Sequence, residues 1–274
     1  MNRPAAQYDQ VAEQYARLVA PRYTAIAALL DAAVGPVASG STVVELAAGT
    51  GTLTRLLAPR VIAADGAYVA LDISIEMLRQ ARETVPPRVE LLVADGEATM
   101  LATSTADLVV SSLGVLQDTD ARWREAARLL HAHGRVVLTM WGVHYAERVL
   151  IAEARRQLGA PPMPTAPLVD AVARAARAGF GSIRHQDFRL PAVHHSMADY
   201  LEYRAAFGAP PWVPPGRQAD ALHAIRDAAA PYVNANGNVE LDRNVTLLEA
   251  SACRHRSYNP SVSAGLSDQP GAET

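Results

Sequence analysis

Residues 43–54 read VVELAAGTGTLT. A short β-branched run enters it and a helical pattern leaves it, so it predicts a turn between a strand and a helix. Gly49 and Gly51 allow a sharp turn and a close approach of the backbone to a ligand. A dinucleotide-binding turn would place a third glycine at Thr54, and Glu45 would oppose a pyrophosphate but suits an ammonium group. Taken alone, the stretch is also compatible with an ordinary tight turn.

Strands and helices alternate on both sides of this turn. The pattern predicts strands at residues 42–46, 67–71, 89–93, 106–111, 136–141, 182–190 and 244–252. Helices are expected over most of the first thirty residues and at 23–33, 53–58, 75–84, 120–131, 146–159 and 167–178. Alternation of this kind indicates βαβ units and a parallel sheet, and the apolar strands suit a sheet covered on both faces. The fold class is therefore α/β.

Acidic or small residues lie at or just after the carboxyl ends of the second, third and fourth predicted strands. Asp72 ends the second strand, where a carboxylate can accept both hydroxyls of a ribose, although an N-cap role for Asp72 or Ser74 is also open. The dipeptide Asp95-Gly96 follows the third strand and suits an adenine edge or a simple turn. Ser111 ends the fourth strand. Because open α/β sheets bind ligands at the carboxyl ends of their strands, these residues predict one nucleoside site.

Composition narrows the function. The net charge of −3 and the isoelectric point near 6.2 argue against a nucleic-acid partner. The chain contains no lysine, which excludes a Walker lysine, a Schiff base and the Tyr-x-x-x-Lys pair of one dehydrogenase type. Its one cysteine, Cys253, and an amino-terminal stretch without an apolar core favour a cytoplasmic protein. No apolar run approaches the ~20 residues of a membrane span, and no metal-ligand spacing is present.

Five segments together resemble the class I S-adenosylmethionine-dependent methyltransferases, in the branch of the ubiquinone- and menaquinone-biosynthesis methyltransferases. They are VVELAAGTGTLTRLLA (43–58), YVALDISIEMLRQAR (68–82), LLVADGEATML (91–101), ADLVVSSLGVLQD (106–118) and ARLLHAHGRVVLTMWG (127–142). The resemblance implies S-adenosyl-L-methionine as the cofactor and a doubly wound, mostly parallel, seven-stranded Rossmann-like sheet with an antiparallel last strand. Ala47 departs from the usual glycine of the turn, and we expect a small adjustment there without loss of binding.

The resemblance also assigns roles to matching positions. Glu45 would lie near the methionine amino group, Asp72 would take the ribose, and Asp95 with Gly96 would bind the adenine edge. The full expected cofactor set is Tyr8, Tyr15, Glu45, Ala47, Gly49, Gly51, Asp72, Ile73, Met77, Asp95, Gly96 and Ser111. Tyr8 and Tyr15 would belong to a helical lid over the cofactor.

The same reading divides the chain. We expect an amino-terminal helical lid (1–36), a cofactor domain (37–191 and 236–254), a helical cap insertion (192–235) and a disordered tail (255–274).

The acceptor is less constrained. Candidate acceptor-site residues are Trp141, His144, Tyr145, His194 and Tyr203. His194 and His195 also suit a solvated loop. The aromatic side chains of Trp141, Tyr200, Tyr203, Phe207 and Trp212 either line a pocket or form the core of the cap.

A small cap suits a small-molecule acceptor for O-, N- or C-methylation, in cofactor or natural-product biosynthesis. A general base is needed only if the acceptor holds a proton. Two alternatives stay open: an NAD(P)-dependent oxidoreductase on a similar sheet, and a non-catalytic binding protein. The sequence leaves the oligomeric state open.

Overall fold

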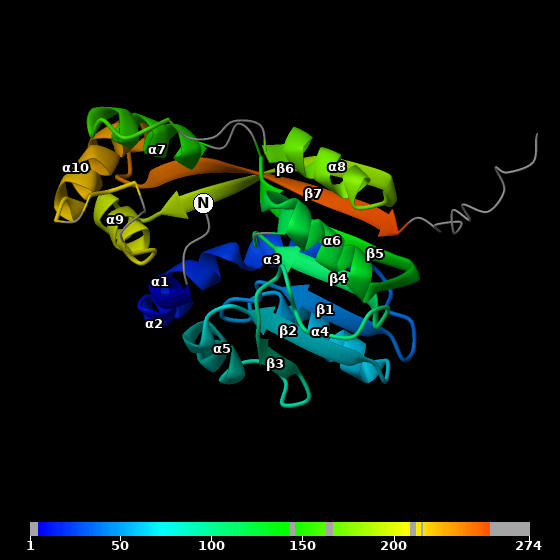
Figure 1. Cartoon of the computed structure of the whole chain (residues 1–274). Helices are drawn as coiled ribbons and strands as arrows, with labels where there is room; N and C mark the ends of the chain where they lie inside the picture. Colours follow the sequence, from blue (N-terminus) through cyan, green and yellow to red (C-terminus); the bar gives the residue numbers. More distant parts are fainter. Residues whose placement is uncertain are drawn as a thin grey trace, which may run out of the picture.

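The computed structural model describes residues 5–114, 116–142, 146–162, 167–208, 212–214 and 216–252. These residues contain one seven-stranded sheet with the order β3-β2-β1-β4-β5-β7-β6 (Figure 1). Its strands are β1 (Thr42–Leu46), β2 (Ala67–Asp72), β3 (Glu90–Val93), β4 (Ala106–Ser112), β5 (Leu130–Trp141), β6 (Phe180–His194) and β7 (Val239–Ala252). The strand β7 runs antiparallel to both neighbours, and the pairs from β3 to β5 are parallel. The predicted fold class is confirmed.

Helices cover both faces of the sheet. They are α3 (Thr24–Val34), α4 (Thr54–Ala63), α5 (Ile75–Arg82), α6 (Asp120–Leu129) and α8 (Pro167–Arg177). Alternate residues of one strand point to opposite faces. Val43 packs in the cluster that contains residues of α3, α4 and α5, while Val44 packs with α6 and α8. This two-sided burial fixes the register of the strands, and with it the level at which each strand ends.

Two helix starts are set by side chains close to the strand ends. Ser74 accepts a hydrogen bond from the Met77 amide at 3.1 Å and begins α5. Thr119 accepts from the Arg122 amide at 3.2 Å and begins α6. A cap of this kind contributes about 1 kcal/mol to helix stability. The N-cap role considered for Ser74 is therefore observed.

Some predicted boundaries are wrong. The helix α4 continues past the predicted end at Ala58, through Pro59, to Ala63, because proline removes one amide while Leu57 and Val61 stay buried against the sheet. The helix α6 ends at Leu129 and β5 follows at once, so residues 130–135 are strand.

The amino-terminal segment is helical but broken, which corrects the expectation of one amphipathic helix. It contains α1 (Ala5–Asp9), α2 (Ala12–Gln14), a π-helical turn (Tyr15–Val19) and a 3₁₀ turn (Ala20–Tyr23) before α3. Pro21 sits at the start of the 3₁₀ turn, where its missing amide disturbs the helix least. Among the described residues, no helix combines the length and apolar character needed to cross a membrane.

The strands β6 and β7 extend beyond the sheet. Residues Leu190–His194 pair with Val239–Arg243 after β5 has ended, and we call this two-stranded extension the arm. Three helices pack with the arm in a separate apolar cluster: α7 (Ala146–Gln157), α9 (Met197–Ala205) and α10 (Gln218–Ala229) (Figure 1). The expected cap (192–235) therefore begins within a strand. Residues 253–274, which include the expected tail, lie outside the described residues.

Candidate active site

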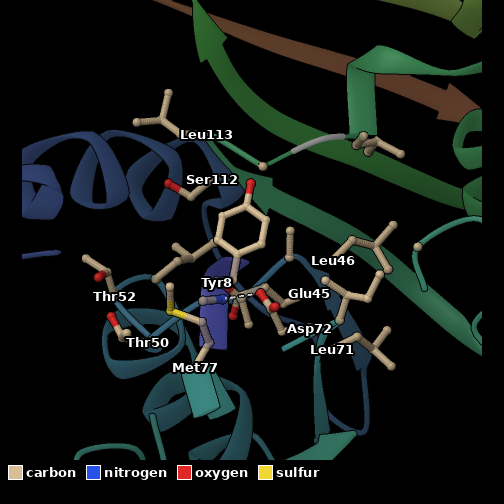
Figure 2. A pocket seen from close by; sticks show the side chains of 18 of the residues that line it. Tyr8, Glu45, Leu46, Thr50, Thr52, Leu71, Asp72, Met77, Ser112 and Leu113 are labelled. Atoms are coloured by element: carbon tan, nitrogen blue, oxygen red, sulfur yellow. Dashed lines mark hydrogen bonds between the residues drawn. The ribbon is translucent and has the colours of Figure 1, made fainter. Parts of the chain in front are cut away.

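A cavity of about 460 Å³ opens where β1, β2 and β4 end. Ten of the twelve predicted cofactor-binding residues line it, namely Tyr8, Tyr15, Glu45, Ala47, Gly49, Asp72, Ile73, Met77, Asp95 and Gly96. Figure 2 shows Glu45, Asp72 and Met77 together with neighbours outside the expected cofactor set, among them Thr50, Ser112 and Leu113. The convergence of strand ends, expected from the sheet topology, is thus present in one cavity.

Glu45 is buried at the end of β1, with 1% of its surface exposed. Its Oε2 accepts hydrogen bonds from the Thr54 hydroxyl at 2.6 Å and the Tyr68 hydroxyl at 2.7 Å. Its Oε1 accepts none from the described residues. Burial raises the pKa of Glu45 from 4.5 to about 7, although both hydroxyl contacts oppose the rise. A cation placed beside this carboxylate would restore its charge.

Asp72 holds the turn of residues 47–51 against the second strand. Its Oδ2 accepts a hydrogen bond from the Gly49 amide at 2.8 Å, and its Oδ1 accepts one from the Ser74 amide at 2.9 Å. Burial raises the pKa of Asp72, and the backbone hydrogen bonds counter part of that rise. Each carboxylate oxygen has further lone-pair capacity, so the group can accept ligand hydroxyls while it shapes the turn.

The turn itself contains a residue in an unusual conformation. Ala47 has φ of 56°, the left-handed region that favours glycine. The expected small adjustment at Ala47 is therefore a strained backbone that still lines the cavity.

Gly51 and Ser111, both predicted to contact the cofactor, do not line the cavity. A Cβ on Gly51 would lie 2.7 Å from Val85 Cγ1, so this glycine lets the turn pack against the chain that follows α5. Ser111 is fully buried and donates a hydrogen bond to the Leu46 carbonyl at 2.9 Å. Ser112, the next residue, faces the cavity instead, because successive strand residues point to opposite faces.

Asp95 and Gly96 line the cavity beyond β3. The Asp95 carboxylate accepts a hydrogen bond from the Glu97 amide at 3.0 Å, so it also makes the local turn that its dipeptide favours. The turn considered for this dipeptide is therefore observed, and its role toward an adenine edge stays a prediction.

Four aromatic rings form a second wall of the same cavity. They are Tyr15, Tyr23, Trp141 and Phe207. Tyr15 and Phe207 meet edge to face at 5.8 Å between ring centroids, and Tyr23 meets Trp141 at 5.7 Å. These rings come from the amino-terminal segment, the end of β5 and the chain after α9. We call them the aromatic wall.

The predicted acceptor residues divide into three groups. Trp141 lines the cavity, while His144 and Tyr145 lie outside the described residues. His194 and Tyr203 do not line it: both are buried in the cluster of the cap helices, with ring centroids 4.9 Å apart. Burial lowers the pKa of His194 from 6.5 to about 4, so the solvated-loop alternative does not hold for His194. The cause is the four-residue extension of β6 past Leu190, which carries His194 into the cap.

Sequence reasoning missed Thr50, Tyr23 and Arg122, all of which line the cavity. The Thr50 hydroxyl is buried without a hydrogen-bond partner among the described residues. The spacing of Tyr8, Tyr15 and Tyr23 was an available signal for Tyr23. The sequence contained no comparable signal for Arg122. This residue lies in the first turn of α6, and its place at the cavity depends on the course of the connection from β4 to α6. In the described part of the chain, no cluster of three or more acidic, His or Cys side chains is arranged to hold a metal ion.

Comparison with known proteins gives a consistent result. Residues 43–134 match the family model for a methyltransferase domain. The ubiquinone/menaquinone biosynthesis C-methyltransferase UbiE of Xylella fastidiosa is 36% identical over 110 residues, which are 38% of this chain and 43% of that protein. The biotin biosynthesis bifunctional protein BioCD of Bordetella avium is 29% identical over 208 residues, 75% of this chain and 43% of that protein. This chain therefore spans less than half the length of the curated relatives it matches.

A solved structure supports the fold. The phosphoethanolamine N-methyltransferase 2 of Haemonchus contortus, in complex with phosphomonomethylethanolamine and S-adenosylhomocysteine, superposes with a TM-score of 0.57 at 18% identity. The superposition covers 93% of this chain and 61% of that one. Together these findings confirm the predicted resemblance.

Proposed function

We propose that this chain, whose domain is that of a class I S-adenosylmethionine-dependent methyltransferase, transfers a methyl group from that cofactor to a small molecule. The observation that carries the proposal is the gathering of Glu45, Asp72 and Asp95 in one cavity at the ends of three strands. An oxidoreductase site for a dinucleotide is disfavoured by the buried carboxylate of Glu45 directly ahead of the turn.

The residues present fit the cofactor. Glu45 lines the cavity and has a raised pKa, which suits an ammonium group that restores its charge. Asp72 would accept the ribose hydroxyls. The Thr50 hydroxyl, buried and without a hydrogen-bond partner in the described part of the chain, would meet a polar group of the methionine part.

The adenine end is less polar. Asp95 and Gly96 would meet the adenine edge, with Met77 and Ile73 flanking its faces. Tyr8 and Tyr15, from the broken amino-terminal segment, would close the cavity, which supports the proposed lid over residues 1–36.

The bound cofactor supplies an electrophilic methyl group on a sulfonium with a good leaving group. The protein contributes position: it must hold the acceptor atom in line, ~3–3.5 Å from the methyl carbon. The turn of residues 47–51, tied to Asp72, fixes one partner. The aromatic wall would hold the other and exclude water, since it is continuous with the cofactor end of the cavity.

The acceptor that this cavity favours is small and at least partly apolar. A volume of about 460 Å³ suits a cofactor and a compact acceptor, and aromatic side chains form much of the remaining wall. The matched UbiE and BioCD proteins are named for ubiquinone/menaquinone and biotin biosynthesis, which supports a role in cofactor or natural-product biosynthesis.

Calorimetric titration tests the proposal. We expect S-adenosylmethionine and S-adenosylhomocysteine to bind with micromolar dissociation constants, on the order of −8 kcal/mol, and NADH not to bind. Binding of NADH alone would support the oxidoreductase and refute the methyltransferase. A radiolabelled methyl donor, offered with acceptor mixtures, then separates an enzyme from a non-catalytic binding protein, because only the enzyme labels an acceptor.

A further inference from the structure

A chain of hydroxyl groups leads from the aromatic wall into the cap. The Tyr23 hydroxyl lies 3.0 Å from the Tyr203 hydroxyl, and Tyr23 lines the cavity. The Tyr203 hydroxyl in turn donates to Glu147 Oε2 at 3.5 Å. Tyr203 and Glu147 are both buried, with 0% and 2% of their surfaces exposed. Glu147 also accepts a hydrogen bond from Arg204 at 2.7 Å, which keeps the carboxylate oriented.

The hydrogen bonds that link Tyr23, Tyr203 and Glu147 do more than give buried hydroxyl groups a partner. Tyr200, one turn earlier on α9, is equally buried, and its hydroxyl has no hydrogen-bond partner among the described residues. The cap therefore tolerates an unpartnered tyrosine hydroxyl. Of these two tyrosines of α9, Tyr203 contacts the Tyr23 hydroxyl and is hydrogen-bonded to a carboxylate, so the link leads toward the cavity.

Charged groups around the chain favour an acceptor that becomes negative. The Arg243 guanidinium lies 5.4 Å from the centre of the Tyr23 ring, and that of Arg204 lies 5.1 Å from the centre of the Phe207 ring. Arg22 lies 5.4 Å from the centre of the Tyr203 ring. Among the described residues, the carboxylates that pair with these arginines are those of Glu147 and Asp199, one fewer than the three guanidinium groups. His194, which also packs on Tyr203, has its pKa lowered by burial.

We propose that Tyr23, Tyr203 and Glu147 form a proton relay, and that the acceptor is an aromatic ring bearing a weakly acidic hydroxyl. This inference rests on the methyltransferase function proposed above. The acceptor oxygen forms a bond to the methyl carbon as the carbon–sulfur bond breaks, and the sulfur keeps the electron pair. The hydroxyl proton passes to Tyr23, the Tyr23 proton to Tyr203, and the Tyr203 proton to the Glu147 carboxylate. The proposal requires that Glu147, with 2% of its surface exposed, lose this proton before the next turnover.

The relay is tested with two phenols that differ in acidity. At pH 8, unsubstituted phenol is protonated, whereas 4-nitrophenol is already largely a phenolate and needs no base. We expect Tyr203→Phe to lower kcat/KM about 10²-fold for phenol and less than threefold for 4-nitrophenol, since a positioned base contributes at least ~10²-fold. In mixtures of H₂O and D₂O, the wild-type rate with phenol should fall along a curve, because several protons move together. The Tyr203→Phe rate should fall linearly.

The matched control is Tyr200→Phe, which removes the same atom from the same helix outside the relay. It should keep both rates within twofold. Equal losses for both phenols in Tyr203→Phe would show a structural role and overturn the relay. If cofactor binds but neither phenol is labelled, the acceptor class is wrong; if no S-adenosylhomocysteine binds, the proposed function itself fails.

A binding measurement that needs no turnover tests the proposal if Tyr203→Phe folds poorly. The absorbance of 4-nitrophenolate bound to the S-adenosylhomocysteine complex reports the pKa of the bound phenol. Tyr23→Phe leaves the cap intact and removes one hydrogen bond to the phenolate, so it should raise that pKa by about one unit. An unchanged pKa would remove Tyr23 from the acceptor site.

Discussion

The raised pKa of Glu45 makes cofactor binding depend on pH in a calculable way. In the free protein, burial sets this pKa at about 7. An ammonium group beside the carboxylate binds only the ionised form, so the complex must release the proton that free Glu45 carries at lower pH. The apparent dissociation constant then scales with one plus the protonated-to-ionised ratio. Between pH 7 and pH 5.5 this factor rises from about 2 to about 30, which is a weakening on the order of fifteenfold, or ~1.6 kcal/mol.

Titration calorimetry with S-adenosylhomocysteine measures this slope directly. At pH 6.5 the free carboxyl is about three-quarters protonated, so binding should release ~0.8 proton, read from the dependence of the binding enthalpy on the buffer. Measurements stay below pH 7.5, so that the amino group of the ligand keeps its proton throughout.

Two controls isolate Glu45 from Asp72, whose pKa is also raised. Glu45→Gln keeps the shape and an acceptor for Thr54 and Tyr68 but cannot titrate, so it should abolish the slope. In addition, 5′-methylthioadenosine, which lacks the ammonium group, should bind the wild-type protein with little dependence on pH over the same range. A slope that persists in Glu45→Gln, or a flat wild-type profile, would refute the assignment of Glu45 to the ammonium group.

Three substitutions probe the rest of the site. Asp72→Ala should raise the dissociation constant for S-adenosylmethionine at least tenfold, through loss of bonds to a charged group on the order of 1.5–3 kcal/mol, and an unchanged constant would remove Asp72 from the site. Ala47→Gly should raise the free energy of unfolding in urea by ~0.5–1 kcal/mol, because glycine relieves the positive φ; a lower value would show that the strain is absent. Gly114→Ala should lower it by ~1–3 kcal/mol, because the added Cβ would lie 2.3 Å from Ser111 Oγ, and a neutral effect would contradict that packing.

The proposed cofactor half of the site could be predicted from the sequence because the sheet topology places its residues. Glu45 and Asp72 lie at the ends of β1 and β2, Asp95 follows β3, and parallel strands end at one edge of the sheet. The error at Ser111 shows the limit of this reasoning. The strand end was placed one residue early, and a shift of one residue exchanges the two faces of a strand.

The acceptor half was not accessible in the same way. Phe207 and Trp141 are far apart in the sequence, and only the course of the arm brings α9 and the end of β5 to one cavity. His194 was misplaced because alternation alone does not reveal where a strand leaves the sheet and enters another cluster. The link between Tyr23 and Tyr203 depends on a contact across 180 residues, which no local pattern encodes.

The arm also makes part of the cap an exchangeable unit. Leu190 and Arg243 are register partners on β6 and β7, so the segment between them leaves and rejoins the sheet at adjacent points. A domain accepts an inserted segment most readily when the two ends of that segment lie close together, because the strands on either side then keep their spacing. Replacing residues 190–243 as one block would change Phe207 and Tyr203 while leaving Glu45 and Asp72 untouched. In the proposed enzyme, acceptor choice would therefore be open to recombination, whereas the proposed donor site would be inherited with the sheet.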